Sequence, residues 1–174
     1  MKQLLAFLLL TLISFTGYAQ DFNHNFQRNS DGIVWDCTFV DSSKSTGDIL
    51  THFLLSEDLK DIRQVGDVIV AHVIKWRPNY KAAGYTDWNI PLYIARSSGF
   101  SGTVKIYASE NRYRVVFSNI VIHASSNPDD PFFPTDSYLN DLAYNFRKDK
   151  FKPSFTAGID KLDKLFQIKF KIDE

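Results

Sequence analysis

The sequence is poor in the residues that cross-link or loosen a chain. Cys37 is its only cysteine, so no internal disulfide can form and stability has to come from the burial of apolar surface. The 8 glycines and 6 prolines among 174 residues are too few for a fibrous or low-complexity protein. With 44% hydrophobic residues, the chain can instead form the core of one folded domain. Cys37 lies in an alternating apolar segment and is therefore expected to be a buried, inert thiol, with pairing between chains as the alternative.

An excess of charge of either sign is also missing. The 20 Lys and Arg residues balance 20 Asp and Glu residues, and Lys2 is the only charged residue in residues 1–19. Proteins that bind nucleic acid need a basic surface to contact phosphates. Nucleic acid is therefore not an expected partner.

A long apolar run occurs only near the N-terminus. Residues 4–15 are almost entirely apolar, follow the positive charge of Lys2, and precede Gly17-Tyr18-Ala19. This pattern predicts a signal peptide over residues 1–19, cut after Ala19, with an uncleaved anchor as the alternative. The run is shorter than the roughly 20 residues of a membrane-spanning helix. We therefore expect a secreted or periplasmic protein without stable membrane insertion, in which polar residues 20–31 form a flexible leader to a single domain over residues 32–174.

Motifs for nucleophilic catalysis and phosphate binding are absent. The sequence contains no Gly-x-Ser-x-Gly elbow and no Ser-x-x-Lys pair. Its nearest glycine cluster, Gly99-Phe100-Ser101-Gly102, lacks the lysine of a phosphate-binding loop. No catalytic residue and no cofactor are therefore assigned.

The residues that could hold a metal ion are scattered. The histidines show neither a His-x-x-x-His pair nor a His-Glu-x-x-His motif; they are His24, His52, His72 and His123. His72 and His123 lie in predicted strands, and we expect both to be hydrogen bonded. They could form a zinc site only if their strands are neighbours. The carboxylates near the prolines of residues 125–135 are expected to form a solvated loop rather than a calcium site; they are Asp129, Asp130 and Asp136. No metal is assigned.

The apolar periodicity changes along the chain and predicts an α+β order. A period of two predicts strands, and a period near 3.6 predicts helices. Ser45 is expected to cap the first helix. The final helix is expected to start at Ser154, with Lys161, Asp163 and Lys164 on its polar side. The expected elements are strands at 33–40, 68–76, 90–95, 103–108 and 112–123, and helices at 45–56, 138–146 and from 154.

This order predicts an antiparallel sheet of about five strands, with two or three helices mainly on one face. Together with the predicted export signal and the hairpin that ends in Asn111-Arg112-Tyr113-Arg114, it resembles a family of small exported proteins of Bacteroidota-type genomes. Members of that family carry a domain of unknown function with a TATA-box-binding-protein-like (TBP-like) fold of β-α-β(4)-α order. The resemblance implies a shape and no catalytic or ligand-binding residue.

One segment has the composition of a binding surface. Aromatic rings with polar edges suit the stacking of sugars or a protein contact, and five of them are mixed with charged residues over residues 76–93: Trp76, Tyr80, Tyr85, Trp88 and Tyr93. The candidate ligand-binding residues among them are Trp76, Tyr80, Tyr85 and Trp88. The alternative is that these rings fold back over one end of the sheet. Arg112 and Arg114 are expected to form a basic strip on the open face, able to meet an anionic glycan or carboxylates, or else to block edge-to-edge pairing of strands.

The sequence thus favours an exported, non-catalytic binding domain for a glycan or a protein partner. The alternative is a small hydrolase of envelope polymers or glycans that uses paired carboxylates, which no single sequence can identify. A subunit of a homo-oligomer whose apolar strand edges pair is a third interpretation, so the oligomeric state stays open.

Overall fold

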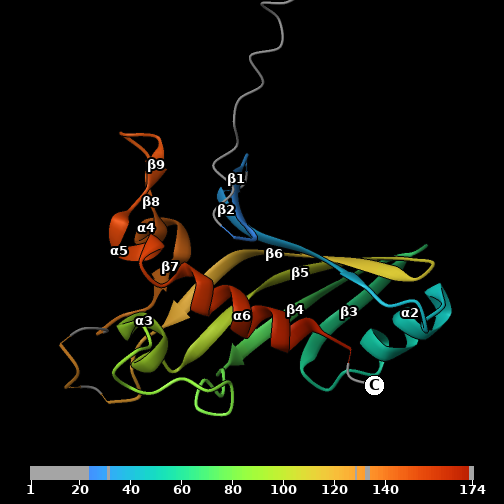
Figure 1. Ribbon diagram of the computed structural model, residues 1–174, viewed down its shortest axis with the longest axis horizontal. Helices are drawn as coiled ribbons and strands as arrows, with labels where there is room; N and C mark the ends of the chain where they lie inside the picture. Colours follow the sequence, from blue (N-terminus) through green and yellow to red (C-terminus); the bar gives the residue numbers. More distant parts are fainter. Residues whose placement is uncertain (1–23, 31, 128, 132–133, 173–174) are drawn as a thin grey trace, which may run out of the picture.

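The fold is built on one antiparallel sheet. The computed structural model describes residues 24–30, 32–127, 129–131 and 134–172, so the predicted signal peptide lies outside the described residues. Six strands follow the order β1-β2-β6-β5-β4-β3, and a seventh, β7, pairs with the far end of β6 (Figure 1). The strands are β1 (Phe26–Asn29), β2 (Gly32–Val40), β3 (Leu59–Val65), β4 (Val68–Trp76), β5 (Gly99–Ser109), β6 (Arg112–His123) and β7 (Ser137–Tyr138).

Five short helices complete the described fold. They are α2 (Thr46–Leu54), α3 (Leu92–Ala95), α4 (Leu139–Ala143), α5 (Pro153–Thr156) and α6 (Ile159–Phe170), and a separate small hairpin pairs β8 (Tyr144–Asn145) with β9 (Lys150–Phe151). The α+β class is confirmed, although the sheet has seven strands rather than about five, and the helices exceed the two or three expected. No helix of the described residues is long and apolar enough to cross a membrane.

Three strands of the sheet were missed, the edge strands β1 and β3 and the two-residue β7, because such strands need little apolar alternation. Residues 26–29, assigned to the leader, form β1 and pair with β2, and Phe26 is fully buried. The charged stretch before residue 65 forms the opposite edge, β3, in which only Leu59 is buried. Most of its other residues are polar and exposed, and the apolar residues Leu59, Ile62 and Val65 do not follow an alternating pattern, so the sequence showed no period of two.

The helix expected at 138–146 is shorter, Leu139–Ala143, because Tyr144 and Asn145 form β8 and pair with β9. Two other local predictions were wrong for reasons of backbone chemistry. Pro91, which suggested an edge strand, instead precedes the four-residue helix α3, because its fixed φ also suits the start of a helix. Ser154 does not cap the final helix, because it lies within the short helix α5, and α6 begins only after Gly158. The cap at Ser45 is confirmed: its Oγ accepts a hydrogen bond from the Asp48 amide, and the Asp48 carboxylate accepts one from the Ser45 amide.

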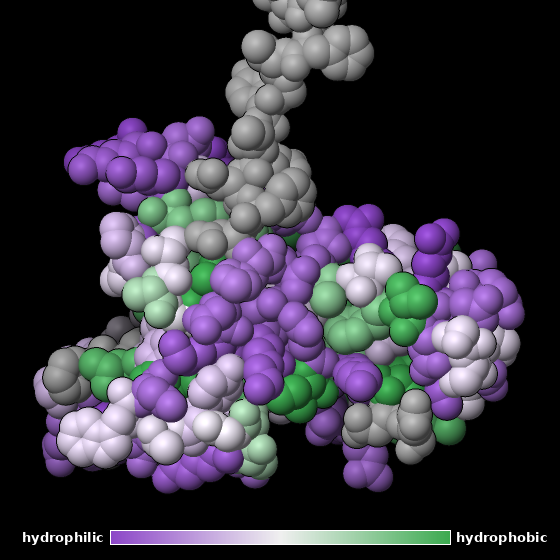
Figure 2. Space-filling view, in the orientation of Figure 1, coloured by the Kyte–Doolittle hydropathy of each residue, from purple (hydrophilic) through white to green (hydrophobic). Residues whose placement is uncertain are grey.

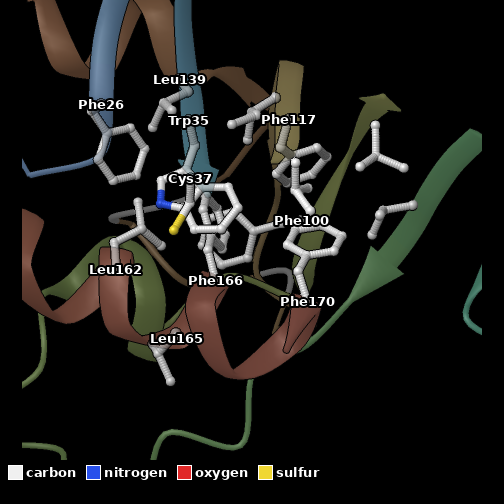
Figure 3. Packing of buried hydrophobic residues seen from close by; sticks show 14 of the residues in the cluster. Phe26, Trp35, Cys37, Phe100, Phe117, Leu139, Leu162, Leu165, Phe166 and Phe170 are labelled. Atoms are coloured by element: carbon white, nitrogen blue, oxygen red, sulfur yellow. The ribbon is translucent and has the colours of Figure 1, made fainter. Parts of the chain in front are cut away.

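The core lies between the sheet and α6, which crosses one face of the strands (Figure 1). Phe166 projects from α6 into a group of rings whose centroids lie 5.3–5.9 Å from its own, seen in part in Figure 3; they belong to Phe26, Trp35, Trp76, Phe100 and Phe117. Helix α2 joins the same side, since Phe53 meets the ring of Tyr113 at 5.4 Å. Hydrophilic residues cover the outward side of α6 (Figure 2).

One residue of α6 lies on the opposite side from that expected. Asp163 was assigned to the polar side of the helix, yet only 6% of it is exposed. Its Oδ1 accepts hydrogen bonds from Trp35 Nε1 and Asn25 Nδ2, both at 2.7 Å, and its Oδ2 accepts one from Gln167 Nε2 at 2.7 Å. The carboxylate therefore joins the N-terminal edge of the sheet, the core and α6.

Candidate functional site

Trp76 belongs to the core rather than to an open surface. Its ring packs against Phe100 and Phe166, with centroid distances of 6.3 and 5.9 Å. Lys169 Nζ lies 5.7 Å from the centre of the indole ring. Trp76 is therefore held between the sheet and α6.

Tyr80 and Tyr85 also fold back toward the core. The Tyr80 hydroxyl donates a hydrogen bond to Asp87 Oδ1 at 2.5 Å, which raises the pKa of Tyr80 and lowers that of Asp87. Lys164 Nζ lies 5.4 Å from the centre of the Tyr85 ring. Three of the four predicted aromatic residues therefore hold their loop against the molecule.

Trp88 differs from the other three rings because it is 98% exposed. It lies at one side of a pocket of about 490 Å³, which we call the Trp88 pocket. The segment from Trp88 to Tyr93 forms one wall, and the other comes from α4, α5 and the start of α6; the lining includes Leu142, Ser154, Ala157, Gly158 and Lys161. The structure thus brings one predicted residue together with partners from segments more than fifty residues away.

Gly158 explains how the two walls meet. A Cβ atom at this position would lie 2.2 Å from Pro91 Cγ, so only glycine allows Pro91 to pack here. Gly158 is also the N-cap residue of α6, and no side chain caps that helix end. The helix start and Pro91 therefore form one continuous part of the pocket lining.

Two polar side chains add chemistry to this mostly apolar lining. Tyr93 is 6% exposed, and its buried hydroxyl has no hydrogen-bond partner among the described residues. Burial, followed by the charge of Asp160, raises the pKa of the Tyr93 phenol, so it stays neutral and able to donate. Lys161 supplies a cation, although its Nζ also lies 3.8 Å from Asp160 Oδ1.

The two arginines of the predicted strip lie on the exposed side of β6, opposite the buried Tyr113 and Val115, and have partners of their own. Arg114 Nε donates to Asp36 Oδ1 at 2.7 Å, and its guanidinium lies 5.8 Å from the centre of the Tyr107 ring. Asp36 raises the pKa of Arg114. Arg112 Nε donates to Ser109 Oγ at 3.4 Å. Neither arginine lines the Trp88 pocket.

A second pocket, of about 560 Å³, lies between α2 and α6. Its lining includes His52, Asp58, Trp76 and Lys169. The Lys169 ammonium is paired with Asp58, and the Lys169 side chain is only 6% exposed. Asp58 immediately precedes β3, so the pair connects that strand to α6 and its two charges are already used within the fold.

The scattered histidines and acids do not assemble into a metal site. No group of three or more potential ligands is found among the described residues. Strand β5 separates the strands of His72 and His123, so these two do not meet as a neighbouring pair. The acidic loop is not uniformly solvated, because Asp130 is 3% exposed and lies 3.5 Å from Arg96.

Comparisons with known proteins return two structures. No protein-family model and no curated protein matches the chain. A DUF4468 family protein from Bacteroides ovatus resembles it with a TM-score of 0.47 and 10% identity, over 86% of this chain and 92% of that one. A TBP-like protein from Parabacteroides distasonis resembles it with a TM-score of 0.43 and 9% identity, over 81% of this chain and 88% of that one. The two descriptions name a family of unknown function and a TBP-like protein, and they are the descriptions of those proteins.

Residues of the Trp88 pocket from the C-terminal part of the chain were missed by the sequence analysis. Tyr93 lies within the aromatic segment. Leu142 was expected on the apolar side of one predicted helix, and Lys161 on the polar side of another. No spacing in the sequence relates them to Trp88. Only the packing of Pro91 on Gly158 brings them together.

Proposed function

We propose that this protein is a binding module for glycans and that a sugar ring stacks on Trp88 in the Trp88 pocket. The observation that carries the proposal is the 98% exposure of Trp88 beside a pocket, while the other three predicted rings pack inward. The exposed Leu92 lines the same pocket as Trp88, and exposed apolar surface that gathers at a pocket is typical of a ligand-binding groove.

The lining favours a sugar over a purely apolar ligand. The indole ring offers a flat face for the C–H groups of a pyranose, and Asn89, Ser154 and Lys161 add polar groups to the lining of the same pocket. Pockets of small-molecule size combine an apolar lining with a few polar groups in this way.

The alternative, a hydrolase that uses paired carboxylates, receives less support. Such enzymes need two carboxyl groups on either side of the scissile bond. Among the described residues that line the Trp88 pocket and the second pocket, Asp58 is the only carboxylate, and it is already paired with Lys169.

The test is a glycan array probed with the mature chain, followed by calorimetry on each glycan that is retained. We expect Trp88→Ala to weaken binding by at least about tenfold, since buried aromatic contacts dominate many binding sites. Its melting temperature should stay near that of the parent, because an exposed ring contributes about 0.5 kcal/mol or less to folding.

Tyr138 provides a matched control. It is an exposed aromatic residue, 59% accessible, on β7 and outside the Trp88 pocket. Tyr138→Ala should bind the same glycans as the parent. The proposal fails if the array retains no glycan, or if Trp88→Ala and Tyr138→Ala bind equally well.

We also propose that the protein acts after export, in the periplasm or outside the cell. The support is the charge of Lys2, the apolar residues 4–15 and the small residues Gly17 and Ala19. Expression in a Gram-negative host should give a mature chain that begins at Gln20, measured by mass spectrometry. An unprocessed N-terminus on a protein retained in the cytoplasm would contradict export.

A further inference from the structure

Three polar side chains form a hydrogen-bonded chain at one end of the sheet. Ser101 lies on β5, His123 ends β6, and Asp136 immediately precedes β7. Ser101 Oγ lies 2.6 Å from His123 Nε2, and His123 Nδ1 lies 2.8 Å from Asp136 Oδ2. The serine and the carboxylate therefore bind opposite nitrogens of one imidazole ring.

Backbone amides determine the direction of these hydrogen bonds. The Ala124 amide donates to Asp136 Oδ1 at 2.7 Å, which holds the carboxylate in place and lowers the pKa of Asp136. An ionised carboxylate only accepts, so His123 Nδ1 carries a hydrogen, and in the neutral ring Nε2 then accepts. The Lys75 amide donates to Ser101 Oγ at 2.8 Å, which leaves the hydroxyl hydrogen to point toward His123.

Irregular pairing produces this arrangement. The β4–β5 ladder shifts between Val73 and Trp76, where Lys75 has a φ of 47°, and the β5–β6 ladder shifts between Ser101 and Thr103. Such bulges turn a side chain away from its regular direction and occur often beside active sites. Here they direct a strand amide and a histidine onto the same serine oxygen.

We propose that Ser101, His123 and Asp136 give this protein an acyl-transfer activity toward small esters, with Ser101 as the nucleophile. The connectivity is that of a serine, histidine and carboxylate triad, which is recognised by geometry rather than by sequence order or fold. His123 is the general base, and Asp136 is a positioning residue that holds its tautomer. The activity is separate from glycan binding at Trp88 and does not depend on it.

The reaction balances with water as the only co-reactant. Ser101 Oγ forms a bond to the carbonyl carbon of the ester, and its proton moves to His123 Nε2. The bond from that carbon to the leaving oxygen breaks, and the departing alcohol takes the proton from Nε2. Water then attacks the acyl-serine and gives a proton to Nε2, which returns it to Ser101 Oγ as the acid leaves.

A fluorophosphonate ester tests this nucleophile directly on the mature chain. It forms a covalent phosphonyl-serine, with loss of fluoride, that peptide mass mapping can locate. We expect one adduct, at Ser101, and none on that peptide in Ser101→Ala. Because a general base contributes about a hundredfold or more, His123→Gln should slow labelling by at least that factor, and Asp136→Asn should also slow it.

Ser118 provides the control. It lies on the neighbouring strand, half-buried, and its hydroxyl donates to the Thr103 carbonyl oxygen at 3.3 Å rather than to a histidine. Ser118→Ala should be labelled at Ser101 at the parent rate. Thermal melting of each variant separates loss of reactivity from loss of fold.

Two results would overturn the proposal. One is a folded parent protein that shows no adduct at Ser101. The other is an adduct whose rate of formation is unchanged in a folded His123→Gln variant. Either result would mean that these residues only fasten β7 to the end of β6.

Discussion

Asp163 provides the sharpest test of how the fold is held together. Replacement by alanine would remove one acceptor from three donors, Trp35 Nε1, Asn25 Nδ2 and Gln167 Nε2. Trp35 is fully buried, so its indole N–H would be left without a partner and without water. The two amides are only partly buried and would recover hydrogen bonds to solvent.

These losses give an expected magnitude. A stranded indole N–H costs about 2 kcal/mol, and each charge-assisted bond to a partly buried amide contributes about 1 kcal/mol, so Asp163→Ala should lower the free energy of unfolding by about 4 kcal/mol. Asp163→Asn keeps an oxygen for Trp35 and Asn25 and should cost about half as much, since Gln167 can turn its own amide to accept.

Urea unfolding, followed by tryptophan fluorescence and by far-UV circular dichroism, measures both variants. Trp35→Phe removes the buried donor, so Asp163→Ala no longer strands an indole N–H in that background. The loss of unfolding free energy in the double variant should therefore be smaller than the sum of the two single losses, by about 1–2 kcal/mol. A loss under about 1 kcal/mol for Asp163→Ala, or additive losses in the double variant, would refute the role assigned to this carboxylate.

Three further predictions concern other parts of the chain. Gly102→Ala should lower the melting temperature, because its Cβ would lie 2.7 Å from a backbone oxygen of β6, whereas Gly47→Ala in α2 meets nothing closer than 3.7 Å and should raise it. Cys37 is buried, with its pKa raised to about 11, so iodoacetamide at pH 8 should alkylate it only after unfolding; rapid native labelling would contradict this. Ser45→Ala should lower the urea midpoint near neutral pH, and it should lower the midpoint by a smaller amount at low pH. The reason is that hydrogen bonds from Ser45 depress the pKa of Asp48 below 3.8 in the folded protein. Their contribution to stability is therefore present above pH 3.8 and is lost as the pH falls through the folded pKa. An equal loss at both pH values would contradict this last prediction.

The predicted and observed folds agree where the local pattern is strong. The hairpin of β5 and β6 and the helix after Ser45 follow from period and capping, because these features act over a few residues. Edge strands β1 and β3 were missed. Each is held by hydrogen bonds to one neighbouring strand rather than by burial on two faces, so its sequence needs few apolar residues. Asp163 was assigned to the polar side of the helix because it is charged. Its position, four residues after Ile159 and three before Phe166, puts it within the apolar stripe of α6.

The candidate site could be predicted only in part. The aromatic segment was found by composition, but composition cannot tell a ring that packs inward, as Trp76 does, from one that faces solvent, as Trp88 does. Ser101 was noted only as part of a glycine cluster without a phosphate-binding lysine. Its relation to His123 and Asp136 depends on strand pairing across 22 and 13 residues.

The sequence alone determined the α+β class, a core without disulfides, the chain's neutral charge and the aromatic segment, because composition and short-range periodicity carry these properties. The tertiary structure decided which residues meet. Pro91 packs on Gly158 to form the Trp88 pocket, and two shifted ladders place Ser101 against His123. These contacts depend on pairing and packing between segments far apart in the chain, and no local pattern encodes their register.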